Sequence, residues 1–301
     1  MTTLVDRSGP NERPSGTEGM QSPASTSGLL EVFRRRYVLR LLVKRELSAR
    51  YQGSFLGMVW SYIQPLVRFL LYYFVIGEII GMGNVVENFA IHVFTAMVFV
   101  NYFTESFTAG TRSIVRNSSI IKKMAVPREM FPVASMIVSA YHTIPGMVIL
   151  LGASMIVGWQ PDPVGLAAGL LGFLIFTVLG TALALLFSAA NVFARDFSNV
   201  VQTLNQFVQF SVPMIYPYSL VDARFGEFAH FYLLNPLAEA VLLMQRCFWV
   251  PTTDDPTLSN LTEMPPNLFP IGFAHLAGTL VVLVIAQLVF IRLEKKFPER
   301  L

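Results

Sequence analysis

The chain has 301 residues, of which 53% are hydrophobic and only 14% are charged, with a net charge of +3 and a mean hydropathy of +0.55. Soluble domains usually carry about 25% charged residues, so this composition excludes an ordinary water-soluble fold and predicts an integral membrane protein. The single cysteine, Cys247, excludes an intrachain disulfide and a cysteine-based metal site.

The first 28 residues are rich in Ser, Thr, Pro and Gly and lack the apolar core of a signal peptide, so they are predicted to form a disordered cytoplasmic tail. Residues 38–48 then predict an amphipathic helix that lies in the headgroup layer and offers a platform for a soluble partner. The alternative is a basic flank that only sets the topology. Its apolar arc comprises Val38, Leu39, Leu41 and Leu42, its polar side Arg40, Lys44 and Ser48, and Val43 and Leu47 interrupt the pattern.

Six apolar runs approach the roughly 20 residues that a membrane-spanning helix needs. They predict an all-α membrane protein with six transmembrane helices. The fifth run is weaker because amides and Pro213 interrupt it. The predicted spans cover residues 57–80, 89–109, 131–158, 164–190, 198–220 and 271–291.

Arg68 lies near the middle of the first span, and an ionisable group at that depth is expected to face protein or water. Glu78 and Glu105 lie closer to span ends and are expected to reach an interface. Aromatic residues are frequent in the first two spans and could stack on sugar rings. The more favoured interpretation is that they are ordinary lipid-facing, helix-packing and interfacial residues.

In the fifth span, Gln202, Gln206 and Gln209 recur at i, i+4 and i+7 and therefore share one helix face. This face is a candidate channel wall. An equally weighted alternative is that the amides only hydrogen-bond neighbouring helices.

Residues 237–250 form an apolar segment bounded by Pro236 and Pro251, which contains Glu239 and Arg246. A segment this short is more typical of a re-entrant or interfacial helix than of a span. We therefore predict short re-entrant external helices between the fifth and sixth spans.

Basic residues set the orientation, because Lys and Arg near span ends accumulate on the cytoplasmic side. They concentrate before the first span, between the second and third, after the fourth and after the sixth, whereas the other loops are mainly acidic. Six spans with both chain ends in the cytoplasm satisfy this whole pattern.

Sequence motifs for catalysis and for nucleotide binding are absent from the chain. Without a G-x-x-x-x-G-K-[ST] loop, the chain is expected not to bind ATP in the Walker manner. It also lacks H-E-x-x-H and G-x-S-x-G, and its four histidines are scattered, so each is expected to be structural. We therefore expect no cofactor and no metal on this chain.

Four stretches resemble the ABC-2 permeases that export lipid-linked polysaccharide. Residues 41–66, LLVKRELSARYQGSFLGMVWSYIQPL, resemble the entry signature of that family, and IIKKMAVPREMFP, residues 120–132, resembles its cytoplasmic loop. Residues 193–200, FARDFSNV, resemble its Arg-Asp turn, and LLNPLAEAVLLMQ, residues 233–245, resembles its Asn-Pro-Leu segment. The resemblance assigns residues 29–301 to one transmembrane domain.

This resemblance implies a non-enzymatic homodimer in the bacterial inner membrane, with two copies of a separate ATPase subunit that bind ATP and Mg. It implies outward transport of a polyprenyl-diphosphate-linked glycan, with cell-wall galactan exporters the most similar and O-antigen and teichoic-acid exporters next. Membrane lipids are the other expected partners, and no nucleic acid is expected.

The resemblance also implies three sets of site residues. The predicted substrate channel comprises Tyr62, Phe69, Tyr72, Tyr73, Gln202, Gln206, Gln209 and Phe210. The predicted ATPase interface comprises Arg40, Lys44, Arg45, Arg50, Arg116, Lys122, Lys123, Arg128 and Glu129. The predicted external gate comprises Asn235, Pro236 and Glu239.

Three other functions stay open on sequence alone. One is an ABC-2 exporter of a drug or small lipid. Another is a membrane enzyme acting on polyprenyl phosphates, for which only Arg195 and Asp196 resemble a catalytic pair. The last is a channel or carrier that works without ATP.

Overall fold

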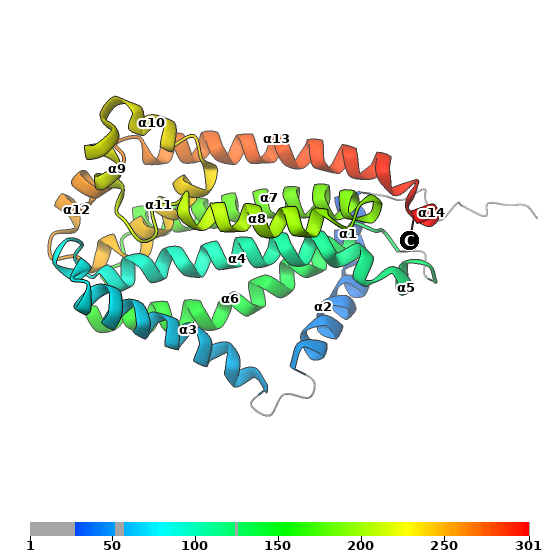
Figure 1. Ribbon diagram of the computed structural model, residues 1–301, viewed down its shortest axis with the longest axis horizontal. Helices are drawn as coiled ribbons and strands as arrows, with labels where there is room; N and C mark the ends of the chain where they lie inside the picture. The colour runs from blue at the N-terminus through cyan, green and yellow to red at the C-terminus, as the bar shows by residue number, and fades with distance from the viewer. Residues whose placement is uncertain (1–27, 52–56, 124–125, 301) are drawn as a thin grey trace, which may run out of the picture.

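The computed structural model describes residues 28–51, 57–123 and 126–300, and within these ranges the chain is all-helical with no strand (Figure 1). The predicted N-terminal tail lies outside the described residues except for Gly28. The α-helices are α1 (Leu29–Arg34), α2 (Arg36–Tyr51), α3 (Trp60–Leu71), α4 (Phe89–Arg116), α5 (Ser118–Ile121), α6 (Met130–Val157), α7 (Pro163–Phe193), α8 (Phe197–Phe210), α9 (Tyr218–Phe225), α10 (Ala229–Tyr232), α11 (Pro236–Phe248), α12 (Pro256–Glu263), α13 (Leu268–Glu294) and α14 (Phe297–Arg300).

The long helices α4, α6, α7 and α13 run side by side along the long axis, and α11 packs among α4, α7 and α13 (Figure 1). Their core is aromatic. The ring of Phe99 on α4 stacks on Phe176 of α7 at 6.3 Å and on Phe248 of α11 at 5.9 Å between centroids. Burying such rings dominates the energetics of a core, so α4, α7 and α11 form its centre.

Three helices among the described residues are long and apolar enough to cross a membrane, namely α6, α7 and α13. They coincide with the third, fourth and sixth predicted spans. The second predicted span is also helical, but α4 continues beyond it to Arg116. The six-span topology as a whole stays a prediction.

The first predicted span is helical but irregular. A 3₁₀ turn at Gly57–Val59 leads into α3, and a π-helical segment, Tyr72–Ile79, follows α3 directly. Neither α3 nor the π segment contains a buried residue. This part of the chain therefore lies on the outside of the bundle.

The fifth predicted span is shorter than expected, because α8 ends at Phe210 rather than near residue 220. Pro213 has no N–H for the helical ladder, its ring would clash with a carbonyl one turn earlier, and it disfavours helical geometry at Val212. A helix of 14 residues spans about 21 Å, less than the hydrocarbon core of about 30 Å.

The apolar face of α2 differs from the predicted arc. Leu39 and Val43, at i and i+4, are the buried residues and pack in one cluster with Met130 and Val133 of α6, whereas Leu41 is 49% exposed. Val43, which interrupted the predicted arc, is therefore central to the contact. The sequence pattern alone could not show that α2 packs on protein along this line.

A polar contact fixes α2 to the end of α4. Glu46 of α2 accepts a hydrogen bond from Arg116 at 2.7 Å and from Asn117 at 3.4 Å. Arg45 in turn donates to the Asn117 side chain at 3.2 Å. We call these four residues the Glu46 cluster. It connects the N-terminal helices to one end of the core helix α4.

Helices α4 and α7 approach closely at Gly110, where a Cβ would lie 2.5 Å from Ala184 Cβ. We expect Gly110→Ala to lower the free energy of unfolding by about 1–3 kcal/mol, because the added methyl would force the two helices apart. Thermal unfolding of the purified protein in detergent measures this.

Gly152→Ala on α6 is the matched control, because nothing lies within 4 Å of a Cβ at that position. Alanine favours a helix by about 1 kcal/mol over glycine, so this variant should be neutral or slightly more stable. Equal melting temperatures for the two variants would contradict the close contact.

Candidate functional site

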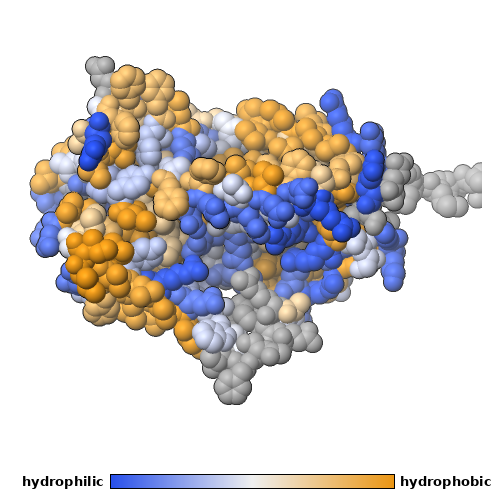
Figure 2. Space-filling view, in the orientation of Figure 1, coloured by the Kyte–Doolittle hydropathy of each residue, from blue (hydrophilic) through white to orange (hydrophobic). Residues whose placement is uncertain are grey.

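A cavity of about 750 Å³ opens between α3, α4, α6 and α8. Figure 2 shows hydrophilic surface gathered along this side of the bundle, with a hollow between apolar regions. The polar side chains that line it belong to all four helices. They are Ser61, Gln64, Arg68, Asn101, Tyr102, Thr104, Glu105, Thr108, Arg112, Arg116, His142, Thr143, Gln202, Asn205, Gln206 and Gln209.

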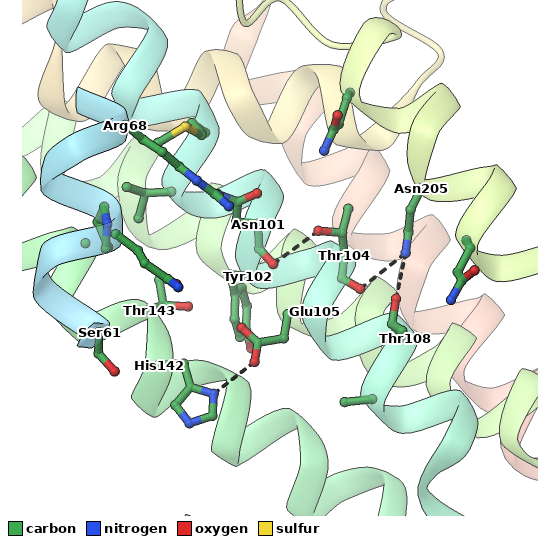
Figure 3. Close-up of a pocket in the computed structure, with 18 of the residues that line it drawn as sticks. Ser61, Arg68, Asn101, Tyr102, Thr104, Glu105, Thr108, His142, Thr143 and Asn205 are labelled. Carbon is green, nitrogen blue, oxygen red and sulfur yellow. Dashed lines mark hydrogen bonds and ion pairs between the residues drawn. The ribbon is translucent and has the colours of Figure 1, made fainter. Parts of the chain in front are cut away.

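The wall contributed by α4 is one polar stripe. Asn101, Glu105, Thr108 and Arg112 recur at helical spacing and therefore share a face, opposite the aromatic side chains that build the core. On α8, Asn205 donates hydrogen bonds to Thr108 Oγ1 at 2.8 Å and to the Thr104 carbonyl at 3.3 Å (Figure 3). These bonds hold α8 against α4 and leave the glutamines of α8 along the cavity.

Glu105 and His142 are hydrogen-bonded across the cavity wall, with Glu105 Oε1 2.9 Å from His142 Nδ1 (Figure 3). The His142 side chain is 6% exposed and that of Glu105 is 32% exposed. Helix α4 extends well past Glu105, and the carboxylate is held by α6 inside the site. That Glu105 reaches a membrane interface stays a prediction.

Arg68 fulfils the expectation that it faces protein or water, because it lines this cavity. It also lines a second cavity of about 480 Å³, which is bounded mainly by apolar side chains of α3, the π segment and α4. An unpaired arginine at the bilayer centre costs roughly 2.5–3.5 kcal/mol on the mildest scale, so a polar surrounding at this position matters.

The predicted channel residues fall into two groups. Gln202, Gln206 and Gln209 line the larger cavity, and Tyr72 lines the smaller one. The other four are not among the residues that line either cavity. The Phe69 ring packs edge-on against Phe94 at 5.1 Å, and the remaining three, Tyr62, Tyr73 and Phe210, are exposed on the surface.

The basic residues of the predicted ATPase interface gather at one end of the bundle, where α1, α5 and α14 lie (Figure 1). Most of them are exposed, and Arg45 and Arg116 are engaged in the Glu46 cluster. The side chain of Arg50 lies outside the part that the structure describes. The exposed members are Arg40, Lys44, Arg45, Arg116, Lys122 and Lys123.

Two members of that predicted interface are wholly or partly buried. Glu129 is fully buried and accepts a hydrogen bond from Gln287 of α13 at 2.9 Å, so its carboxylate is not on a docking surface. Arg128 donates to the Glu294 carbonyl, and its guanidinium lies 5.5 Å from the Phe297 ring centre. Both residues fix the start of α6 to the end of α13.

The predicted external gate is built into the core at the opposite end. Asn235 caps α11 by accepting from the Leu237 N–H at 3.0 Å, and it donates to the Ser211 carbonyl at 3.0 Å. Pro236 is the first residue of α11 and is half-buried. Glu239 is fully buried, and its carboxylate accepts no hydrogen bond within the described ranges, so it is not exposed at the surface.

Two hydrogen bonds of 2.9 Å join Arg246 of α11 to the carboxylate of Asp162, which also accepts from the Gly165 N–H and so caps α7. The Arg246 guanidinium holds the Asp162 pKa below its ordinary value of 3.8. Because the Asp162 pKa is lower in the folded protein than in the unfolded chain, the ion pair stabilises the fold fully above the ordinary pKa of 3.8. This stabilisation is lost as the pH falls through the lower pKa of the folded protein.

Sequence reasoning identified the glutamines and Arg68 but missed the stripe on α4 and its partners His142 and Asn205. The regular spacing of Asn101, Glu105, Thr108 and Arg112 was an available signal, since polar residues in a span point at protein or water. No sequence pattern pairs Glu105 with His142, because that contact depends on how α4 packs against α6.

Comparison with known proteins gives a consistent result. Residues 37–248 match the family of ABC-2 type transporters. A curated relative from Myxococcus xanthus, the O-antigen export system permease protein RfbA, is 27% identical over 73% of this chain and 83% of its own length. An O-antigen export system permease protein RfbA from Klebsiella pneumoniae is 26% identical over 70% of this chain and 80% of its own length.

The ion pair between Asp162 and Arg246 predicts a pH dependence of stability. We expect the melting temperature of wild type to exceed that of Asp162→Asn by a constant difference between pH 7 and pH 5. This difference should shrink as the pH falls below about 3.8. The Asp162 side chain is 37% exposed, so solvent screening should limit the margin to about 1–3 °C.

The measurement is thermal unfolding in detergent across this pH range. Asp254→Asn is the control, because Asp254 makes no ion pair among the residues that the structure describes. A margin that does not depend on pH would contradict the role of the pair.

Proposed function

Since the chain belongs to the ABC-2 type transporter family, we propose that it is the transmembrane permease subunit of an ATP-driven polysaccharide exporter. Its substrate is a polyprenyl-diphosphate-linked glycan of cell-wall galactan or O-antigen type, which it moves from the cytoplasmic to the outer face of the bacterial inner membrane. The two relatives are named as O-antigen export permeases, which supports this substrate class.

The observation that carries the proposal is the polar cavity between α3, α4, α6 and α8. Its wall presents amides and hydroxyls from four helices along the length of the bundle. Such groups exchange hydrogen bonds with sugar hydroxyls without demanding one orientation. A hydrated polymer can therefore slide past them, whereas a purely apolar wall would require it to lose its hydration.

The exposure of the two helices that flank the cavity supports a homodimer. Helix α3 has no buried residue and α8 buries only Val201. Both carry exposed apolar side chains beside the polar stripe, including Leu70 and Phe74 near α3 and Phe207 on α8. A second copy placed against them would cover this apolar surface and close the groove into a channel between the protomers.

The ATPase subunits, two copies in the dimer, dock at the basic end of the bundle. The exposed lysines and arginines there provide positive charge, and the Glu46 cluster joins α2 to α4. Pressure on α2 is thus transmitted to the helix that carries most of the cavity wall. Alternating closure of the channel follows from ATP binding and release by the partner.

The proposed topology has six spans with both chain ends in the cytoplasm. In support, α1 and α14 lie at the same end of the bundle, together with the basic loop that includes Lys122 and Lys123 (Figure 1). The helices between α8 and α13 lie toward the other end, and we assign α11 as the re-entrant element there.

A drug or small lipid is a second candidate substrate, and the apolar cavity of about 480 Å³ favours it, because that volume suits a drug-sized ligand. The two candidates differ in the cell. Depletion of a glycan exporter causes a lipid-linked glycan to accumulate inside, whereas loss of a small-lipid exporter leaves glycan export unchanged.

Replacement of Lys122 and Lys123 by Glu should weaken binding of the ATPase subunit by about threefold or more, because like charges across a docking surface repel. Quantitative pull-down of the ATPase subunit with the tagged chain measures this. Lys295→Glu with Lys296→Glu, an exposed pair at the same end, is the matched control. Unchanged recovery with the first pair would argue against this loop as a docking site.

The function itself is tested by purifying the tagged chain from native membranes in mild detergent and identifying its partners by mass spectrometry. We expect an ATPase with a phosphate loop in about equal amount, and a lipid-linked glycan that accumulates on the cytoplasmic side when the chain is depleted. Recovery of the chain alone, with normal glycan export after depletion, would refute the proposal.

A further inference from the structure

Arg68 stands where the two cavities meet. It lines both of them, together with Asn101, Gln209 and Met97. On one side of this junction lies the larger cavity with its amides and hydroxyls. On the other side, Leu71, Val75 and other apolar residues bound the smaller cavity. The polar cavity and the apolar cavity therefore meet at the guanidinium of Arg68.

Among the residues that the structure describes, no carboxylate is paired with Arg68. Within the part of the chain that the structure describes, its guanidinium makes no hydrogen bond or ion pair, and Figure 3 shows it reaching into the cavity toward Asn101. Glu105 is the sole carboxylate among the residues that line the two cavities, and His142 already pairs with it. Arg112 adds further positive charge to the same wall, whereas Arg116 is paired with Glu46.

Cations at membrane depth are normally paired with anions, so an unpaired guanidinium in a cavity indicates an anionic ligand. Arginine suits phosphate oxygens in particular, because its planar fork donates two parallel hydrogen bonds. The side-chain amides of Asn101 and Gln209 supply further donors beside it.

We propose that Arg68, with Asn101 and Gln209, binds the diphosphate group of the substrate. The glycan then occupies the larger polar cavity, and the first part of the prenyl chain occupies the smaller apolar cavity. This inference rests on the proposed exporter function. It places the diphosphate, which links the glycan to the prenyl chain, at Arg68.

An acidic sugar shares the anionic oxygens of a diphosphate. The apolar cavity directly beside Arg68 favours the lipid diphosphate, since a uronic acid has no apolar tail to place there. Binding measurements with both classes of anion separate these two sources.

The experiment uses the full-length chain with its co-purified partner subunits in lipid nanodiscs, and it measures binding of farnesyl diphosphate, inorganic pyrophosphate, farnesol and glucuronate. Wild type should bind farnesyl diphosphate most tightly, pyrophosphate more weakly and the other two weakest. Glucuronate binding as tight as that of farnesyl diphosphate would overturn the assignment to a diphosphate.

Three variants separate the contributions of the two halves of the site. Arg68→Gln should weaken binding of both farnesyl diphosphate and pyrophosphate by about tenfold or more, because charge-assisted hydrogen bonds are lost. Arg68→Lys should retain part of the affinity, since the charge remains but the fork does not. Leu71→Gln should weaken farnesyl diphosphate but leave pyrophosphate unchanged.

Arg292→Gln is the matched control, because Arg292 is exposed on α13 and lines neither cavity. Equal gel-filtration profiles and melting temperatures establish that the variants are folded. Unchanged pyrophosphate binding by folded Arg68→Gln would overturn the inference. The proposed function is tested separately by glycan export in cells. It stands if cells with the wild-type chain export glycan, and it is refuted if they do not.

Discussion

The two faces of α4 have opposite requirements, and the rest of the bundle is arranged to meet both. One face carries the phenylalanines that build the core with α7 and α11. The other carries an amide, a carboxylate, a hydroxyl and a guanidinium, which membrane lipid cannot solvate. Helices α6 and α8 supply partners to that polar face, and α3 stands far enough away to leave a water-accessible space.

Much of the fold could be predicted from the sequence because span length and basic loops depend on the bilayer rather than on tertiary contacts. The helices α6, α7 and α13 follow their predicted spans within a few residues. The end of α8 did not follow, although Pro213 was a visible breaker. A hydropathy window averages over many residues and therefore hides a single proline. In the folded chain that proline ends the helix, because it has no N–H to continue the hydrogen-bond ladder.

The candidate site was predictable only in part. Polar spacing on one helix is visible in a sequence, as with Gln202, Gln206 and Gln209, but a partner on another helix is not. Glu129 is a second residue whose partner on another helix is not visible in the sequence. The family resemblance implies a place for it at the ATPase interface, yet its carboxylate is buried and accepts a hydrogen bond from Gln287, 158 residues away. Burial of a charged residue depends on a distant helix that local pattern cannot identify.

The Glu46 cluster has a thermodynamic consequence of its own. Coupling between two binding sites is reciprocal. If binding of the proposed partner at α2 alters the polar cavity, then a substrate in that cavity alters the affinity of α2 for the partner. A substrate that displaces α4 by a fraction of an ångström changes the geometry among Glu46, Arg116 and Asn117. If the ATPase subunit docks at α2 as proposed, the same few hydrogen bonds also relay the occupancy of the groove to the docking surface.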